Sequence, residues 1–346
     1  MRAMIEGYEI FPGEHCGSAS MRGLLKHYCG LALPEAAVFG LSAGLDCMYL
    51  ENPALDPPVA VFGRTPTLEA DLGRILEVDY REQTDPDDDH AWEAVRDEVL
   101  AGRPTMLSGD ILYLDYREFK VHFPGHRFVL LGFDDPAQKA FVADRVRDVP
   151  EACSYAALRK SRNPPEGLST RNLWGRFHDT RVGRTLPDAA RLAIRTCAER
   201  MLGRAAEPRD AGPLSPDAAA RAAFGVAGIR RFAEALPGWA ARDDARWAAS
   251  FNARCIEKFG NGGGNFRRLY AGFLAWARAL DPGLAPADAP QLATRAADGW
   301  TAISERLAAA SAEGADATPF AEAAALAREV ADVEEKLFEG LAAHAG

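Results

Sequence analysis

Hydrophobic and polar positions follow two different patterns along the chain. Before about residue 161, short β-rich runs alternate with helical patterns and with Gly and Pro at turn positions, which is typical of a mixed α/β domain. The runs that favour strands are Val59 to Phe62, Thr105 to Leu107, Phe128 to Phe133 and Ala140 to Val146. After Leu186 the strand patterns stop, and Ala-rich segments with apolar residues three and four apart predict helices.

The helical half predicts several separate helices. They cover residues 188–202, 242–258, 266–280, 290–309 and 318–342, and a further one begins at Ser215. A chain of 346 residues is also too long for one ordinary core. We therefore expect an α/β domain over residues 1–165, a linker over 166–186 that is rich in Arg, Gly, Pro and Asn, and an all-α domain over 187–346.

Charge and cysteine content narrow the class of protein. The chain has 40 basic and 50 acidic residues, a formal charge of −10, which argues against nucleic-acid binding and mildly favours a cationic small molecule. The N-terminus lacks the pattern of a signal peptide, and the longest weakly polar stretch, Ala36 to Leu45, is too short to cross a membrane. The six cysteines form no CxxC pair, so we expect reduced thiols in a cytoplasmic protein that does not bind membranes.

Cys16 is the strongest candidate for a nucleophile. It precedes Met21, Leu24, Leu25 and Tyr28, whose spacing predicts an amphipathic helix that ends at Gly30. A cysteine at a helix N-terminus lies near unpaired N–H groups, which favour the thiolate and can stabilise an oxyanion. The alternative is a buried structural cysteine, but the small polar neighbours favour a functional one. The other five cysteines lie within or beside apolar patterns and are expected to pack.

His126 and Asp144 are the candidates for a base and its partner. The sequence from His126 to Val146 predicts a β-hairpin that turns through residues 134–138. If the pairing is centred on the turn, Phe128 lies opposite Asp144, and His126 is diagonally adjacent on the same face. A slip of one residue would send Asp144 to the other face. Taken alone, each residue also fits a structural role, but the set of Cys16, His126 and Asp144 matches a cysteine–histidine–acid site.

These residues resemble the butirosin biosynthesis protein H family. The matching residues are His15, Cys16 and Ser18, then Gly40 to Leu45, Phe62 to Arg64, His122 to His126 and, in the second half, Gly260 to Leu274. The resemblance implies a papain-like fold related to bacteriocin-processing cysteine peptidases. The best-known member of that family moves an aminoacyl group from an acyl carrier protein to an aminoglycoside amine, so the resemblance implies chemistry of this kind.

The resemblance implies roles for individual residues. Cys16 would accept the acyl group, His126 would be the general base, and Asp144 would orient it. Related peptidases place a Gln a few residues before the nucleophile, but here that region reads Glu9, Ile10, Phe11, Pro12. Oxyanion donors are therefore expected from the backbone or from another side chain, and an activated thioester suits the site better than a peptide bond.

Further residues are candidates for substrate binding. They are His15, Ser18, Arg64, Asp110, Tyr113, His122 and Arg267. Asp110 and Tyr113 belong to an acidic and aromatic loop that either holds the acceptor amine or is an ordinary exposed loop. Arg267 follows a Gly-rich turn in the layout of an anion site, which could bind the phosphate of a carrier's phosphopantetheine or serve only as a connector.

His122 and His126 are four apart, but Pro124 and Gly125 between them exclude a regular helix, so we expect no metal.

The function that we expect is N-acyl transfer in the biosynthesis of a specialised metabolite. The acyl group would pass from a carrier-protein thioester to Cys16 and then to an amine-bearing small molecule, with no cofactor beyond the donor's phosphopantetheine. A cysteine hydrolase, which would use the same residues with water as acceptor, is the first alternative. A non-catalytic module that binds a carrier or a peptide is the second, and a homodimer is left open.

Overall fold

The computed structural model describes residues 1–53, 55–166, 169–205 and 221–345. The chain divides into two compact units, each built from two separate segments. The first unit comprises Met1–Val38 and Leu76–Gly183, and the second comprises Phe39–Ile75 and Arg184–Gly346. The borders fall within α2 (Glu35–Leu41) and at the end of α3 (Leu68–Leu76).

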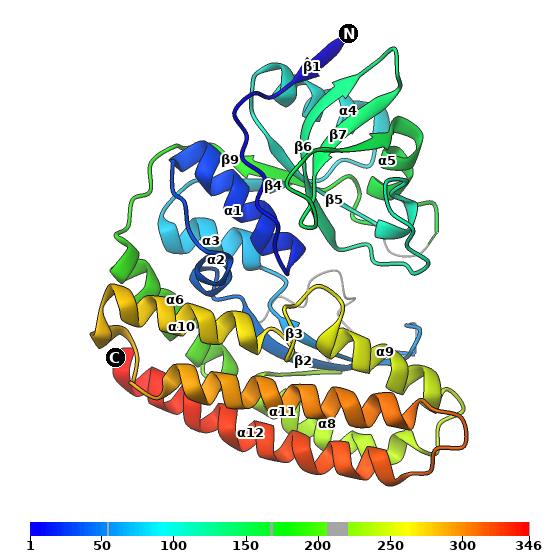
Figure 1. The fold of residues 1–346 in the computed structure, drawn as a ribbon, viewed down its shortest axis with the longest axis vertical. Coiled ribbons are helices and arrows are strands. Elements are labelled where there is room, and N and C mark those ends of the chain that lie inside the picture. Colours follow the sequence, from blue (N-terminus) through cyan, green and yellow to red (C-terminus); the bar gives the residue numbers. More distant parts are fainter. Residues whose placement is uncertain (54, 167–168, 206–220, 346) are drawn as a thin grey trace. The chain divides into compact units, whose positions relative to one another are not determined.

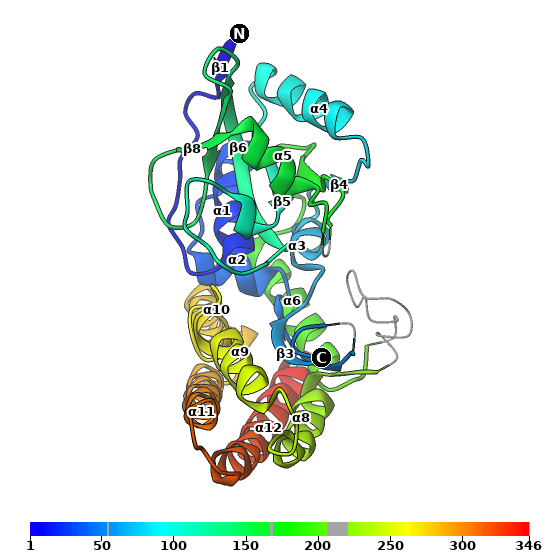
Figure 2. The same ribbon diagram turned by 90° about the vertical axis from the view of Figure 1, so that its right-hand side faces the viewer.

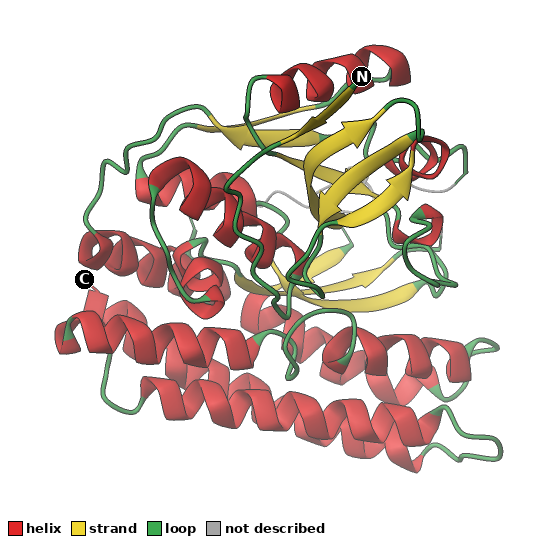
Figure 3. Cartoon of the chain, turned by 45° about the horizontal axis from the view of Figure 1, so that its top comes forward, coloured by secondary structure: helices red, strands yellow, loops and turns green. Residues whose placement is uncertain are grey.

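The first unit is a mixed α/β structure (Figure 1). Its strands are β1 (Arg2–Met4), β4 (Tyr80–Gln83), β5 (Thr105–Gly109), β6 (His126–Asp134), β7 (Lys139–Ala143), β8 (Glu151–Ser154) and β9 (Trp174–Phe177). Its helices are α1 (Cys16–Cys29), α4 (Asp88–Leu100), α5 (Tyr155–Arg162) and the short 3-10 turn η1 (Ile111–Tyr113). The strands form one antiparallel sheet in the order β4-β9-β5-β6-β7-β8, and β1 adds to β6 (Figure 3).

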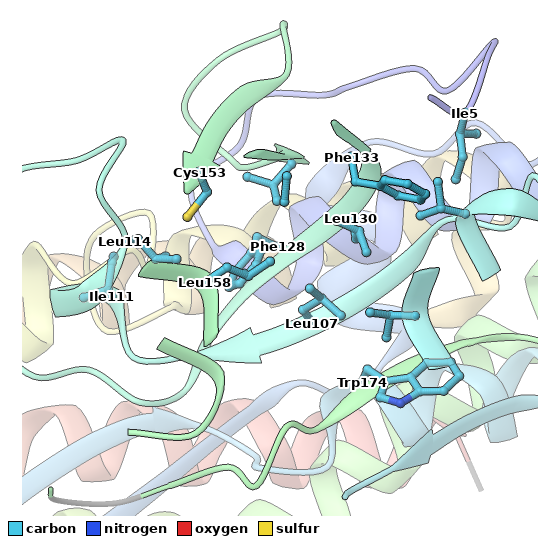
Figure 4. Close-up of a cluster of buried hydrophobic side chains, with 14 residues drawn as sticks. Ile5, Leu107, Ile111, Leu114, Phe128, Leu130, Phe133, Cys153, Leu158 and Trp174 are labelled. Atoms are coloured by element: carbon cyan, nitrogen blue, oxygen red, sulfur yellow. The ribbon is translucent and has the colours of Figure 1, made fainter. Parts of the chain in front are cut away.

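Helices cover both faces of this sheet. Phe128 and Leu130 point to the face on which α4 and α5 pack, and they join a buried apolar cluster there (Figure 4). Val129 alternates to the opposite face, where it lines a small pocket with Ala19 and Ser20 of α1. Because both faces are covered, β6 is buried along nearly its whole length, and its first residue, His126, is held in a dry environment.

The second unit is mainly helical. Its helices are α6 (Leu186–Met201), α8 (Gly225–Trp239), α9 (Ala245–Glu257), α10 (Arg267–Leu280), α11 (Ala289–Ala310) and α12 (Thr318–Ala345), with most of α3 and the short turn η2 (Pro282–Leu284). The long helices α11 and α12 lie side by side, and α12 also packs against α8 (Figure 2). Strands β2 (Leu45–Glu51) and β3 (Val59–Arg64) join β10 (Ala222–Phe224) in a three-stranded antiparallel sheet.

The sheet of the second unit changes two expectations. The C-terminal region is helical, as expected, but it is not all-α, because β10 pairs with β2. The first expected domain, residues 1–165, also contributes residues 39–75 to the second unit, because β2 and β3 form the rest of that sheet. Strands β10 and β2 are far apart in the sequence, so no local sequence pattern predicts that they pair. The helix start expected at Ser215 lies outside the described residues.

Among the described residues, no helix is both long enough and apolar enough to cross a membrane.

Candidate active site

Cys16 is the first residue of α1, as its sequence pattern predicts. His15 caps the helix, because its Nδ1 accepts the backbone N–H of Ser18 at 3.2 Å. The helix ends at Gly30, whose φ of 64° lies in the left-handed region where glycine is favoured. Met21, Leu24 and Leu25 are fully buried, so the apolar stripe fixes the helix on the sheet. The sulfur atom is thereby placed at the positive end of the helix dipole.

Glu35 fixes the turn that leads into Cys16. Its carboxylate accepts the backbone N–H groups of Glu14 and His15, each at 2.8 Å, and the Ser18 hydroxyl, also at 2.8 Å. The Ser18 hydroxyl also lies 3.1 Å from His15 Nδ1. His15 and Ser18, which the sequence assigned to substrate binding, are both buried and belong to this cap. Glu35 was missed because a single glutamate 19 residues after the nucleophile carries no recognisable motif.

The β6–β7 hairpin has the register that the sequence predicts at its open end. Val129 pairs with Ala143 and Leu130 with Val142, and the pairing shifts by one residue only beyond Leu130. Asp144, which follows β7, therefore lies on the same face as His126. Its Oδ2 is 2.8 Å from His126 Nε2, and both side chains are buried.

Three further donors hold Asp144. The Tyr116 hydroxyl donates to Oδ2 at 3.0 Å, the Arg117 guanidinium contacts Oδ2 at 3.1 Å, and the backbone N–H of Arg145 donates to Oδ1 at 2.6 Å. Burial and the neighbouring charge of Asp144 raise the pKa of Tyr116 well above its usual range, so the phenol keeps the proton that it donates. The carboxylate is thus fixed by side chains from the loop between β5 and β6, whose roles the sequence did not reveal.

The charges of His126 and Asp144 stabilise one another. Burial on its own would lower the pKa of His126, but the Asp144 carboxylate and hydrogen bonds to Asp144 and Cys16 raise it to about 9. Burial on its own would raise the pKa of Asp144, but the charge and hydrogen bond of His126, together with Arg117, lower it to about 2. The Asp144 carboxylate therefore favours the charged form of the imidazole, beside the Cys16 thiol.

Cys16, His126 and Asp144 come together in the first unit. The Cys16 thiol hydrogen-bonds the His126 ring, and Nε2 of that ring is engaged by Asp144, which leaves Nδ1 for the sulfur. The backbone joins the two halves of the site, since the Gly13 N–H donates to the Arg145 carbonyl oxygen at 2.8 Å. The turn before the nucleophile is thereby attached to the residue that follows Asp144.

The other thiols lie in different surroundings. Burial raises the pKa of the Cys29 thiol to about 11 and that of Cys197 to about 12. Burial likewise raises the pKa of Cys153 and of Cys255 well above the ordinary range for a thiol. These four cysteines are therefore poor nucleophiles at neutral pH, as their apolar sequence context indicates.

Asp110, Tyr113 and His122 form a second group in the same unit. Asp110 Oδ2 lies 2.7 Å from His122 Nδ1, and the rings of Tyr113 and His122 meet edge to face with centroids 5.9 Å apart. Gly109 pairs with His126 across β5 and β6, so this group begins one residue from the partner of His126. The structure therefore brings these three sequence candidates together and places Asp110 one residue from the strand partner of His126.

Arg64 and Arg267 belong to the second unit. The Arg64 guanidinium donates to the Thr65 carbonyl oxygen at 2.9 Å. Arg267 is buried and forms a two-pronged ion pair with Glu334, with N–O distances of 2.7 and 2.8 Å. Trp300 Nε1 also donates to Glu334 at 2.8 Å. Because its donors are used inside the unit, Arg267 is a structural residue and not the anion-binding residue that its sequence context suggested.

The Gly-rich turn before α10 is a connector for the same reason. The backbone N–H of Gly264 donates to the Glu257 carboxylate at 2.9 Å, so this donor is already used within the unit. Gly264 has a φ of 57°, and a Cβ there would lie 2.7 Å from the Cβ of Ala297. Close packing of the turn against α11 accounts for the glycine.

Among the described residues, no group of three or more His, Cys, Asp or Glu side chains is arranged to hold a metal ion.

Comparison with known families agrees with the two-part sequence pattern. Residues 15–145 match the family described as "Butirosin biosynthesis protein H, N-terminal", and this match includes Cys16, His126 and Asp144. Residues 156–341 match "Domain of unknown function (DUF4872)". No curated protein matches the chain significantly. The chain belongs to the butirosin biosynthesis protein H family, whose name indicates a part in biosynthesis, and it carries both the N-terminal domain of that family and this C-terminal domain.

Proposed function

We propose that the chain is a cysteine-dependent N-acyltransferase that carries an acyl group from a carrier-bound thioester to an amine. The observation that carries this proposal is the position of His126, which hydrogen-bonds both the Cys16 thiol and the Asp144 carboxylate. A thiol, an imidazole and a buried carboxylate in this order are the components of nucleophilic acyl transfer. The order along the chain, with the cysteine on an N-terminal helix and the histidine at the start of a strand, also supports a papain-like fold.

In the first half-reaction, the Cys16 thiolate attacks the thioester carbonyl carbon. An imidazolium beside the sulfur favours the thiolate, and the amides at the N-terminus of α1 are the natural donors to the oxyanion. The C–S bond to the donor then breaks, and His126 gives its proton to the departing thiolate. The products are acyl-Cys16, a neutral His126 and a free donor thiol, so the proton count balances.

In the second half-reaction, the acceptor amine attacks acyl-Cys16. His126, now neutral, takes a proton from the attacking nitrogen and delivers it to the sulfur of Cys16 as the C–S bond breaks. Asp144 keeps the imidazole in one orientation throughout, because Tyr116, Arg117 and Arg145 fix the carboxylate. The products are an amide and the free thiol.

The burial of the site supports a slender acyl donor. Cys16 is only 6% exposed, and His126 is 2% exposed. An extended arm such as the phosphopantetheine of an acyl carrier protein can reach a buried sulfur, whereas a folded protein substrate cannot. A dry site also favours transfer, because water competes with the amine for the acyl group.

Product analysis separates transfer from hydrolysis. The protein is incubated with an acyl N-acetylcysteamine thioester, a mimic of the pantetheine arm, with and without a primary amine such as ethanolamine. Transfer predicts an amide whose formation requires the amine, and it predicts little free acid. Free acid formed at the same rate with and without the amine would establish a hydrolase instead. If Cys16→Ala still forms the amide and the free acid as the wild type does, this site carries out neither transfer nor hydrolysis.

A further inference from the structure

The first unit contains a second carboxylate–imidazole pair, which the two half-reactions above do not use. Asp110 Oδ2 lies 2.7 Å from His122 Nδ1, while Oδ1 accepts the backbone N–H of Phe123 at 2.9 Å and of Leu112 at 3.1 Å. The Asp110 side chain is 2% exposed and that of His122 is 54% exposed. A fully bonded, buried carboxylate therefore orients an imidazole that is exposed to solvent.

The Asp110 end of this pair follows the strand partner of the candidate base. Gly109 is the register partner of His126, and Asp110 follows it directly. Paired Cα atoms in antiparallel strands are about 5 Å apart and consecutive Cα atoms about 4 Å, so the Cα atoms of Asp110 and His126 are within about 9 Å. The Ile111 N–H donates to the Phe123 carbonyl oxygen at 3.2 Å, which closes the base of the loop that carries His122.

The surroundings of His122 leave its second nitrogen accessible. The ring contacts Tyr113, and the ammonium of Lys160 lies 4.3 Å from the centroid of the Tyr113 ring. Asp110 and Tyr113 thus contact His122 directly, and Lys160 contacts Tyr113. Within the part of the chain that the structure describes, only Asp110 hydrogen-bonds the His122 ring, and it does so at Nδ1. Nε2 is the nitrogen that remains for proton exchange.

Acyl transfer to an amine needs one more proton acceptor than His126 provides. An alkylamine has a pKa of about 10, like lysine, so at neutral pH it arrives as an ammonium ion with no lone pair for attack. Acyl-Cys16 and the ammonium ion give an amide, the free thiol and one proton, as a C–N bond forms and a C–S bond breaks. His126 moves one proton from the nitrogen to the sulfur. The other proton must leave the ammonium ion before attack.

We propose that His122, oriented by Asp110, takes this first proton from the ammonium acceptor at Nε2 and releases it to solvent. The inference rests on the proposed transferase function, because a water nucleophile carries no such proton.

His122→Gln, compared with the wild type in each half-reaction, tests the proposal. Acyl-Cys16 is formed from an acetyl N-acetylcysteamine thioester and followed by intact-protein mass spectrometry. Its decay at neutral pH is then measured with ethanolamine, which is protonated, and with hydroxylamine, which is largely neutral. We expect acylation within about twofold of the wild type, transfer to ethanolamine slower by about 10²-fold, and transfer to hydroxylamine nearly unchanged.

His90→Gln is the matched control, because His90 is also an exposed histidine whose Nδ1 is bound by an aspartate, Asp85, in the same unit. Its half-reactions should equal those of the wild type. If His122→Gln transfers to both amines at wild-type rates, or loses both equally, His122 is not the acceptor's base and the inference is overturned. If the wild type forms no acyl-Cys16 at all, the proposed function fails, and the inference fails with it.

Discussion

His126 and Asp144 are hydrogen-bonded across the open end of the β6–β7 hairpin, with Nε2 and Oδ2 2.8 Å apart. The bond fixes the ring so that Nδ1 is left for the thiol of Cys16, with which the ring also hydrogen-bonds. Because both side chains are buried, the carboxylate stabilises the imidazolium with little screening by water.

Asp144→Asn should slow the first half-reaction strongly. The amide keeps the shape of the carboxylate but lacks its charge and presents an N–H group to His126, which favours the wrong tautomer. We expect acyl-enzyme formation to fall by about 10²-fold or more. Stopped-flow mass spectrometry or release of the donor thiol measures the rate. Asp148→Asn is the matched control, because Asp148 is an exposed residue of the same loop. Equal rates in Asp144→Asn and the control would show that Asp144 does not orient the base.

The pH dependence of acylation should reflect the raised pKa of His126. The productive imidazolium persists up to about pH 9, so the rate should be level across neutral pH and should fall as pH rises through about 9. In Asp144→Asn the fall should move to lower pH, since the Asp144 charge is the main interaction that raises the His126 pKa. A decline with the same midpoint in both proteins would contradict this assignment.

The same shift predicts how stability depends on pH. A group whose pKa is raised on folding contributes stability below its unfolded pKa of 6.5 and loses it as pH rises through the folded value of about 9. The free energy of unfolding of the wild type should therefore drop between these two pH values relative to His126→Gln, which lacks the group. Urea denaturation at both ends of the range measures the difference. Parallel stability curves would place the His126 pKa near its ordinary value.

Glu35→Ala should damage both stability and acylation, because three donors lose their acceptor. They are the backbone N–H groups of Glu14 and His15 and the Ser18 hydroxyl. We expect the free energy of unfolding to fall by about 1–3 kcal/mol, measured by urea denaturation, with slower acylation by the folded protein. Glu93→Ala on the exposed face of α4 should change neither quantity. A Glu35→Ala protein that acylates normally would show that the position of Cys16 does not depend on this turn.

Replacement of Arg267 should lower the free energy of unfolding much more than replacement of Arg268. Arg267→Met leaves Glu334 buried without its partner, so the free energy of unfolding should fall by about 3–5 kcal/mol. Arg268→Met removes an exposed pair with Asp298 and should cost no more than about 1 kcal/mol. Denaturation of the two variants makes the comparison. Similar small losses in both would reopen a binding role for Arg267.

Local patterns in the sequence predicted the parts of the site that depend on neighbours along the chain. The helix after Cys16 and its end at Gly30 follow from apolar spacing and a single glycine. The position of His126 and Asp144 on the same face of the hairpin follows from strand alternation and the length of the turn. These features are predictable because each is set by residues that are close in sequence.

Features set by distant residues could not be predicted in this way. Strand β9 (Trp174–Phe177) falls within the expected linker, and it forms a strand because it pairs with β4 and β5. Arg117 reaches Asp144 from a loop 27 positions earlier, and Glu334 neutralises Arg267 from 67 positions away. From the sequence alone, an isolated charged residue is expected to lie on the surface. Only the folded chain shows which buried partner it has.

The covalent capture of an acyl group by Cys16 is the central claim, and intact-protein mass spectrometry tests it most directly. After incubation with an acyl N-acetylcysteamine thioester, the wild type and Cys29→Ser should each gain the mass of one acyl group, and peptide mapping should place it on Cys16. Cys16→Ala should gain none. An adduct on another cysteine, or an equal gain in Cys16→Ala, would contradict the account.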